Sequence, residues 1–141
     1  MAGNINPIYS KVGDIQVGNT KILTTANTAL DGTGTLATIW TADATNGGYL
    51  DRVRLKPATH NAATTGTSVR FFINDGTTPG VTTVTFIGST TLPATTEAAA
   101  TGTIDYEYPI RIMFPPGYKL LAALGTTSTN GWILCPIGGK Y

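Results

Sequence analysis

The chain has 141 residues, of which 12% are charged and 41% are hydrophobic, and its net charge is +1 at pH 7. This length suits one domain with a core of its own, and the hydrophobic share excludes an intrinsically disordered chain. The near-zero charge argues against a protein that binds nucleic acid through its phosphates, because such a protein needs a basic surface.

The first 20 residues predict an extended N-terminal arm ahead of a domain at 21–141. They are polar and interrupted by Pro7, with only scattered apolar residues and at most a short strand near 15–17. No basic segment followed by an apolar core is present at the start, so we expect no signal peptide and synthesis in the cytoplasm. No apolar run reaches membrane-spanning length, which predicts no membrane partner. Four arm residues are candidate contacts with a neighbouring subunit, since an ordered terminus needs a contact to hold it: Ile5, Pro7, Ile8 and Tyr9. Packing of the arm on its own domain is the alternative and would hold it equally well.

Short apolar runs separated by Gly, Pro, Asn and Asp follow in regular succession. They predict strands at 21–25, 35–41, 49–56, 68–74, 81–87, 104–114, 118–124 and 132–135. Turns are predicted between them, for example at Asp31-Gly32, Asn46-Gly47-Gly48 and Asp75-Gly76. Helix and strand compete at 118–124, where the flanking glycines and the short length favour a strand.

The run 104–114 has the clearest period of two. Isoleucines and aromatic residues fall on one parity, while Asp105, Glu107, Pro109 and Arg111 fall on the other. Because successive side chains of a strand point to opposite faces, this run predicts a strand with one buried and one solvated face. Pro109 has no N–H to donate, which indicates a sheet edge or a bulge at that point.

The fold class that follows is all-β: a single-domain antiparallel β-sandwich. Long polar connections are predicted at 57–66 and 88–102, and these suit crossovers between two sheets. They favour a jelly-roll-like topology, with an immunoglobulin-like sandwich as the alternative.

One basic stripe stands out in the predicted strand 49–56. Arg52, Arg54 and Lys56 share one face, whereas Val53 and Leu55 share the other with Tyr49. Three cations in a row are candidate contacts for acidic residues of a partner. The same stripe is somewhat more typical of a solvated face that is protected from edge pairing. No aromatic residues alternate with the cations, as stacking on nucleic-acid bases would require.

Groups able to perform catalysis are few. The single histidine, His60, lies in a predicted loop, and the single cysteine, Cys135, lies in an apolar strand that predicts a small buried residue. Asp105 and Glu107 lie two residues apart, as a pair that binds calcium or serves a glycosidase can. This spacing is more typical of a solvated strand face, on which Arg111 can offset their charge. No spacing indicates a metal site or a phosphate loop. We therefore expect no enzyme, no catalytic or metal-ligating residues and no cofactor.

Four segments carry a resemblance to a known family: 21–34, 51–57, 92–95 and 114–118. With their turns and strands, they resemble small virion proteins of tailed bacteriophages, which are encoded among head genes. That family consists of capsid decoration or cement-type proteins with a jelly-roll-like fold. The resemblance extends over most of residues 20–141 and does not include the arm.

The resemblance implies a structural protein that decorates or cements a tailed-phage capsid and stabilises contacts between its subunits. The implied partners are the major capsid protein and further copies of the chain, a trimer being one such assembly, and the implied location is the capsid surface of the virion. A carbohydrate-binding or adhesion sandwich of a phage tail or fibre is the alternative. It would present exposed aromatic residues, for which Trp40, Phe72 and Trp132 are the candidates.

Overall fold

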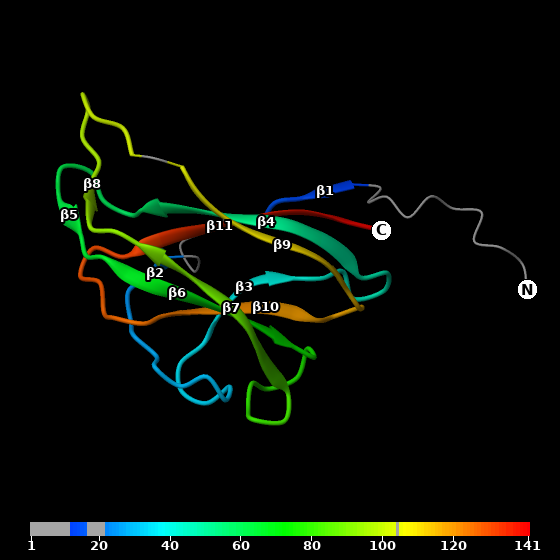
Figure 1. The fold of residues 1–141 in the computed structure, drawn as a ribbon. Coiled ribbons are helices and arrows are strands. Elements are labelled where there is room, and N and C mark those ends of the chain that lie inside the picture. The colour runs from blue at the N-terminus through cyan, green and yellow to red at the C-terminus, as the bar shows by residue number, and fades with distance from the viewer. Residues whose placement is uncertain (1–11, 17–21, 104) are drawn as a thin grey trace, which may run out of the picture.

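The computed structural model describes residues 12–16, 22–103 and 105–141. These residues form strands and no helix, as the sequence predicts (Figure 1). The strands are β1 (Val12–Asp14), β2 (Ile22–Leu23), β3 (Ala37–Thr41), β4 (Gly48–Pro57), β5 (Ala63–Thr64), β6 (Thr67–Asn74), β7 (Val84–Leu92), β8 (Thr95–Thr96), β9 (Tyr106–Phe114), β10 (Lys119–Leu124) and β11 (Trp132–Lys140). Among the described residues, no helix is long and apolar enough to span a membrane.

Two antiparallel sheets face each other. Sheet 1 has the order β1-β11-β4-β9, with β2 also paired to β11, and sheet 2 has the order β3-β10-β6-β7. The pairing is nested: β1 pairs with β11, β3 with β10, β4 with β9 and β6 with β7. A long hairpin that is rolled up gives this arrangement, which is the topology of a jelly roll. The predicted fold class is therefore confirmed.

The core lies between the sheets and contains the apolar parity of β9. Ile110 and Phe114 are buried, and Tyr106, Tyr108 and Ile112 pack partly buried against the core. Ile104 lies outside the described residues. Across the sandwich, the ring of Phe71 stacks on Tyr108 with 4.6 Å between the ring centroids. The alternation in the sequence thus places this strand correctly.

The outer face of sheet 2 is also covered. Phe72 points away from the main core but is fully buried, in a second cluster with Val84, Leu121 and Ala123. Leu36, from the connection between β2 and β3, packs against this cluster. The Asn27 side chain fixes that connection, because its amide group donates to the carbonyl oxygens of Thr33 and Thr35 at 2.8 and 3.1 Å.

Several strand boundaries differ from those that the sequence predicts. β7 continues to Leu92, and β11 continues through both glycines of the expected tail to Lys140. The short strands β5 and β8 pair within the two connections that were expected to be loops. In each case the strand pairs with a strand that is distant in sequence. The residues of the segment alone therefore do not reveal the interaction that makes it a strand.

The predicted face of Tyr49 is wrong, because β4 contains a bulge. Ile137 pairs with Arg52 and the next residue, Gly138, pairs with Leu50, so that Asp51 has no partner in β11. The additional residue reverses the alternation. Leu50 is consequently fully buried together with Val53 and Leu55, and Tyr49 is only half-buried.

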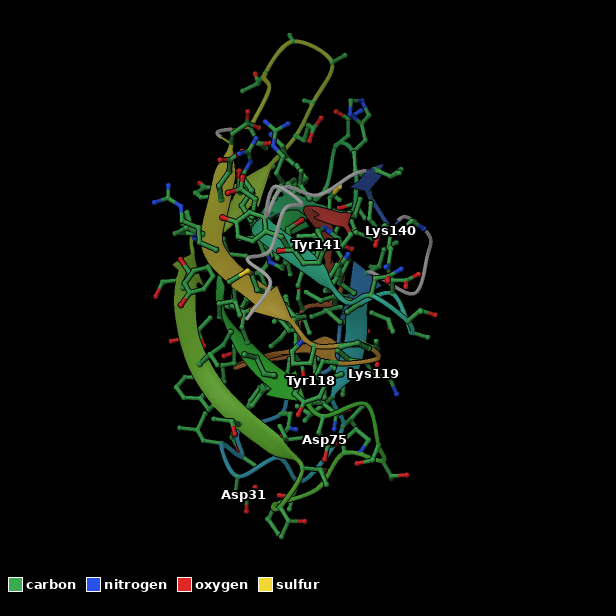
Figure 2. All side chains as sticks on the ribbon, turned by 90° about the vertical axis from the view of Figure 1, so that its right-hand side faces the viewer. Asp31, Asp75, Tyr118, Lys119, Lys140 and Tyr141 are labelled. Carbon is green, nitrogen blue, oxygen red and sulfur yellow. The ribbon has the colours of Figure 1, made fainter. Side chains whose placement is uncertain are left out.

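Two predicted turns have the same structure. Asp31-Gly32-Thr33 and Asp75-Gly76-Thr77 each place an aspartate Oδ1 where it accepts hydrogen bonds from the threonine N–H and hydroxyl group. These bonds, the one from the threonine hydroxyl first, lower the pKa of both aspartates. In Figure 2 both turns lie on the sheet 2 side of the molecule, away from Lys140 and Tyr141.

The described part of the predicted arm runs along an edge of sheet 1. Val12, Gly13 and Asp14 pair with Lys140, Gly139 and Gly138. The Gln16 side chain then spans the two sheets: it donates to the Thr41 carbonyl oxygen at 2.7 Å and accepts from the Thr41 N–H at 3.0 Å. This pair of bonds caps the end of β3 much as a neighbouring strand would.

Candidate functional site

A row of charged residues crosses the outer face of sheet 1 where β4 and β9 pair. Val53 and Leu55 point into the core, so Arg52, Arg54 and Lys56 point outward. In the register of the two strands, Arg54 lies opposite Glu107, and Arg52 lies opposite Pro109. Asp105 immediately precedes β9. We call Arg52, Arg54, Lys56, Asp105 and Glu107 the charged ladder.

Each cation of the ladder contacts a carboxylate. Arg54 Nη2 lies 2.7 Å from Asp105 Oδ2, and Arg54 Nε lies 3.0 Å from Glu107 Oε1. Arg52 Nε lies 3.5 Å from the same glutamate oxygen, and Lys56 pairs with Asp105. The side chains are between 36% and 52% exposed, and exposed ion pairs of this kind contribute about 0–1 kcal/mol each. The ladder therefore adds little stability, and its main effect is to fix a pattern of charge on this face.

Asp105 has a lowered pKa. The hydrogen bond from Lys56 is the largest cause, and the positive charge of Arg54 acts in the same direction. A carboxylate whose pKa is lower in the folded state stabilises the fold above its ordinary value of 3.8, and this contribution disappears as the pH falls through the lowered value.

Asp105→Asn should therefore destabilise the fold slightly at neutral pH and much less in acid. Melting temperatures at neutral pH and at about pH 2, which is below the usual pKa range of aspartate, measure the difference in stability between variant and wild type. Glu97→Gln, which removes a carboxylate outside the ladder, controls for net charge. A difference between Asp105→Asn and wild type that stays constant with pH would contradict the assigned role.

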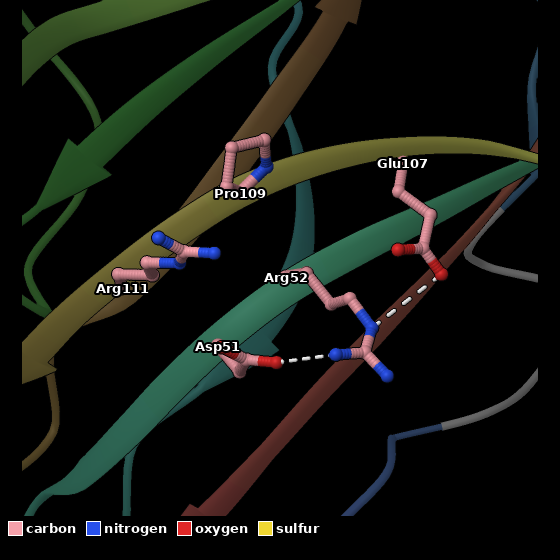
Figure 3. Close-up of a pocket in the computed structure, with 5 residues that line it drawn as sticks. All are labelled: Asp51, Arg52, Glu107, Pro109 and Arg111. Carbon is pink, nitrogen blue, oxygen red and sulfur yellow. Dashed lines mark hydrogen bonds and ion pairs between the residues drawn. The ribbon is translucent and has the colours of Figure 1, made fainter.

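A shallow hollow adjoins the ladder. It has a volume of about 230 Å³ and is lined by Asp51, Arg52, Glu107, Pro109 and Arg111 (Figure 3). Two bulges meet there. Asp51 is the additional residue of β4 relative to β11, and β9 in turn has an additional residue opposite Asp51. Pro109 therefore lies both on an edge strand and beside a bulge, the two settings that its missing N–H indicates.

The predicted partner contacts have different outcomes. The structure brings Arg52, Arg54 and Lys56 together on one face and pairs each with a carboxylate of the chain itself. The four arm candidates lie outside the described residues: Ile5, Pro7, Ile8 and Tyr9. Arg111 does not offset Asp105 or Glu107 as expected, because no ion pair in the described part of the chain joins it to either. The hollow was not predicted, although Pro109 gave a signal for the bulge beside it.

The residues considered for catalysis are not assembled into a site. His60 is exposed in the connection after β4, and Cys135 is half-buried on β11 opposite Arg54. No hydrogen bond links these two side chains in the described structure. Within residues 12–16, 22–103 and 105–141, no three His, Cys, Asp or Glu side chains are grouped to hold a metal ion.

The aromatic residues considered for sugar binding are inside the protein. Trp40, Phe72 and Trp132 are all fully buried. Every other aromatic side chain of the described residues is also buried or half-buried. None of the three candidates can stack on a sugar without unfolding.

Comparisons of the chain with protein-family models, with curated proteins and with solved structures found no match. The fold and the charged face of sheet 1 are therefore the observations on which a functional proposal can rest.

Proposed function

We propose that the chain is a structural protein of a tailed-phage head, which decorates the capsid and stabilises contacts between its subunits. Its partners in this role are the major capsid protein and copies of itself, with a trimer as one possible assembly, and its location is the capsid surface after synthesis in the host cytoplasm. The role requires no enzymatic step. The resemblance to phage head proteins and the jelly-roll fold both support it.

The observation that carries the proposal is the distribution of charge. Seven of the 17 charged residues of the chain belong to the ladder and the hollow. The outer face of sheet 2, by contrast, carries an apolar cluster under the connection between β2 and β3. Charges that neighbouring side chains hold in place favour one partner and one orientation, because electrostatic complementarity determines specificity more than affinity. The ladder face is therefore the surface that we assign to the capsid.

The two glutamates of the chain allow a matched test of this assignment. Glu107 lies in the ladder, and Glu97 lies in the connection after β8. Glu107→Lys removes the carboxylate that holds Arg52 and Arg54 in place and repels both arginines, so the fixed pattern of charge is lost. Glu97→Lys makes the same change of charge elsewhere. Capsids assembled without the chain should bind wild type and Glu97→Lys equally, and Glu107→Lys at least about tenfold more weakly, or about 1.4 kcal/mol.

Melting curves of both variants verify that each is folded before binding is compared. Equal binding of folded Glu107→Lys and wild type would remove the ladder from the interface. Failure of the wild-type chain to bind capsids at all would overturn the proposed role itself.

A further inference from the structure

The hollow contains a residue in an unusual backbone conformation. Arg111 has a φ of +54°, in the left-handed region that residues other than Gly and Asn seldom adopt. It lies in the bulge of β9, where glycine would be easier to accommodate. Bulges can redirect a side chain, and a strained residue that persists is often related to function.

The strained backbone places a cation without a carboxylate partner at the hollow. Arg52 Nη1 donates to Asp51 Oδ2 at 2.6 Å, and its Nε lies near Glu107. Arg111, on the opposite side, is exposed and has no ion pair with any described residue. Its guanidinium group carries five N–H donors and extends over the side of the hollow where Arg52 lies (Figure 3).

The charges around the hollow favour one class of ligand. Two arginines and two carboxylates line it, so the lining is neutral before a ligand binds. A monoanion can pair with the free guanidinium of Arg111. A phosphate dianion would bring a second negative charge close to Asp51 and Glu107. A carboxylate also matches the planar fork of donors on arginine.

The size of the hollow limits what can enter. A volume of about 230 Å³ accommodates a side chain and a few waters, since a water occupies about 30 Å³ in the liquid. Pro109 forms one wall and offers no N–H that would compete for the ligand. A whole helix or strand does not fit inside, whereas one side chain of a docked protein does.

We propose that the hollow receives the carboxylate of an Asp or Glu side chain from a partner protein, with Arg111 as the residue that binds it. The inference extends the proposed function, because it names the chemistry by which the ladder face holds its partner. It depends on the phage role only in that a protein docks on this face, and it can be tested without a capsid.

The test compares wild type, Arg111→Gly and Arg111→Lys. Glycine removes the guanidinium group and the backbone strain together, so this variant should melt at the same temperature as wild type or higher. The probes are a capped hexaglutamate peptide, a capped hexalysine peptide and inorganic phosphate. Binding is followed by the NMR signals of the arginine Nε–H groups and of the amides of β4 and β9.

Hexaglutamate should shift the signals of Arg111 and Arg52 in wild type in a saturable manner. The affinity should fall at least about tenfold in Arg111→Gly, and by less in Arg111→Lys, which keeps the charge but not the planar fork. Hexalysine should leave these signals unchanged, and phosphate should bind more weakly than the peptide.

Three results of the peptide and melting experiments would overturn the inference: hexaglutamate binding that is unchanged in Arg111→Gly, phosphate binding as strong as that of the peptide, or a clear loss of stability in Arg111→Gly. The last would show that the arginine supports the fold. Capsid binding separates this inference from the proposed function. If Arg111→Gly bound capsids as tightly as wild type, the hollow would be excluded while the structural role remained.

Discussion

Replacing Trp132 with Ala should lower the free energy of unfolding by about 3–5 kcal/mol, as large-to-small changes of buried aromatic residues do. Trp132 is fully buried at the start of β11, and its ring packs edge-to-face with that of Tyr106, with 6.1 Å between the ring centroids. Its indole Nε1–H also donates to the Thr65 carbonyl oxygen at 3.1 Å. The change removes both the packing and this hydrogen bond. Urea denaturation followed by circular dichroism measures the loss.

Trp132→Phe is the matched control, because it keeps an aromatic ring and removes the indole N–H. The hydrogen bond alone should contribute about 1 kcal/mol, so this variant should lie much closer to wild type than to Trp132→Ala. Equal losses of unfolding free energy in the two variants would mean that the hydrogen bond, and not the packing, holds β11 at this point.

Gly88→Ala should cost about 2–4 kcal/mol, the combined effect of overpacking and backbone strain. Gly88 lies in β7 with a φ of +152°, and a Cβ atom there would overlap the Tyr108 hydroxyl. Tyr108 cannot easily move away, because its ring is stacked on Phe71. The contact joins the edge strands of the two sheets, so the substitution should push them apart.

A double-mutant cycle with Tyr108→Phe separates the two causes. Removing the hydroxyl group removes the severe overlap, so that the nearest ring atom, Cζ, lies 3.3 Å from the added Cβ, and it leaves the unfavourable φ. The double variant should therefore recover at least about 1 kcal/mol relative to additivity. Thermal or urea unfolding of the four proteins provides the measurement. Additive losses would show that backbone strain alone explains the cost.

The sequence predicts the strands well wherever one face is buried and the other solvated. The alternation through Tyr106, Tyr108 and Ile110 identified β9 and its inward face, and Pro109 indicated the edge and the bulge. Alternation is a property of the strand's own sequence, so it can be recognised without knowing which strands pair with it. The same reasoning failed at Tyr49, because the bulge at Asp51 exists only relative to β11.

Features that depend on distant partners could not be predicted. Phe72, a candidate for an exposed aromatic residue, is buried because the connection between β2 and β3 packs over it through Leu36. The stripe of Arg52, Arg54 and Lys56 was visible, but its pairing with Asp105 and Glu107 requires the register of β4 against β9. The alternation placed Arg111 on the solvated face, but its positive φ could not be predicted, since it arises from the bulge of β9.

The most direct test of the proposed function is the location of the chain in assembled particles. Under this proposal a phage encodes the chain, and its virions can be separated into heads and tails by density-gradient centrifugation. The chain can then be quantified in each fraction by mass spectrometry. The proposal predicts that the chain sediments with tail-free heads, at a constant ratio to the major capsid protein. Recovery with tails or fibres, or only in the fraction without particles, would contradict it.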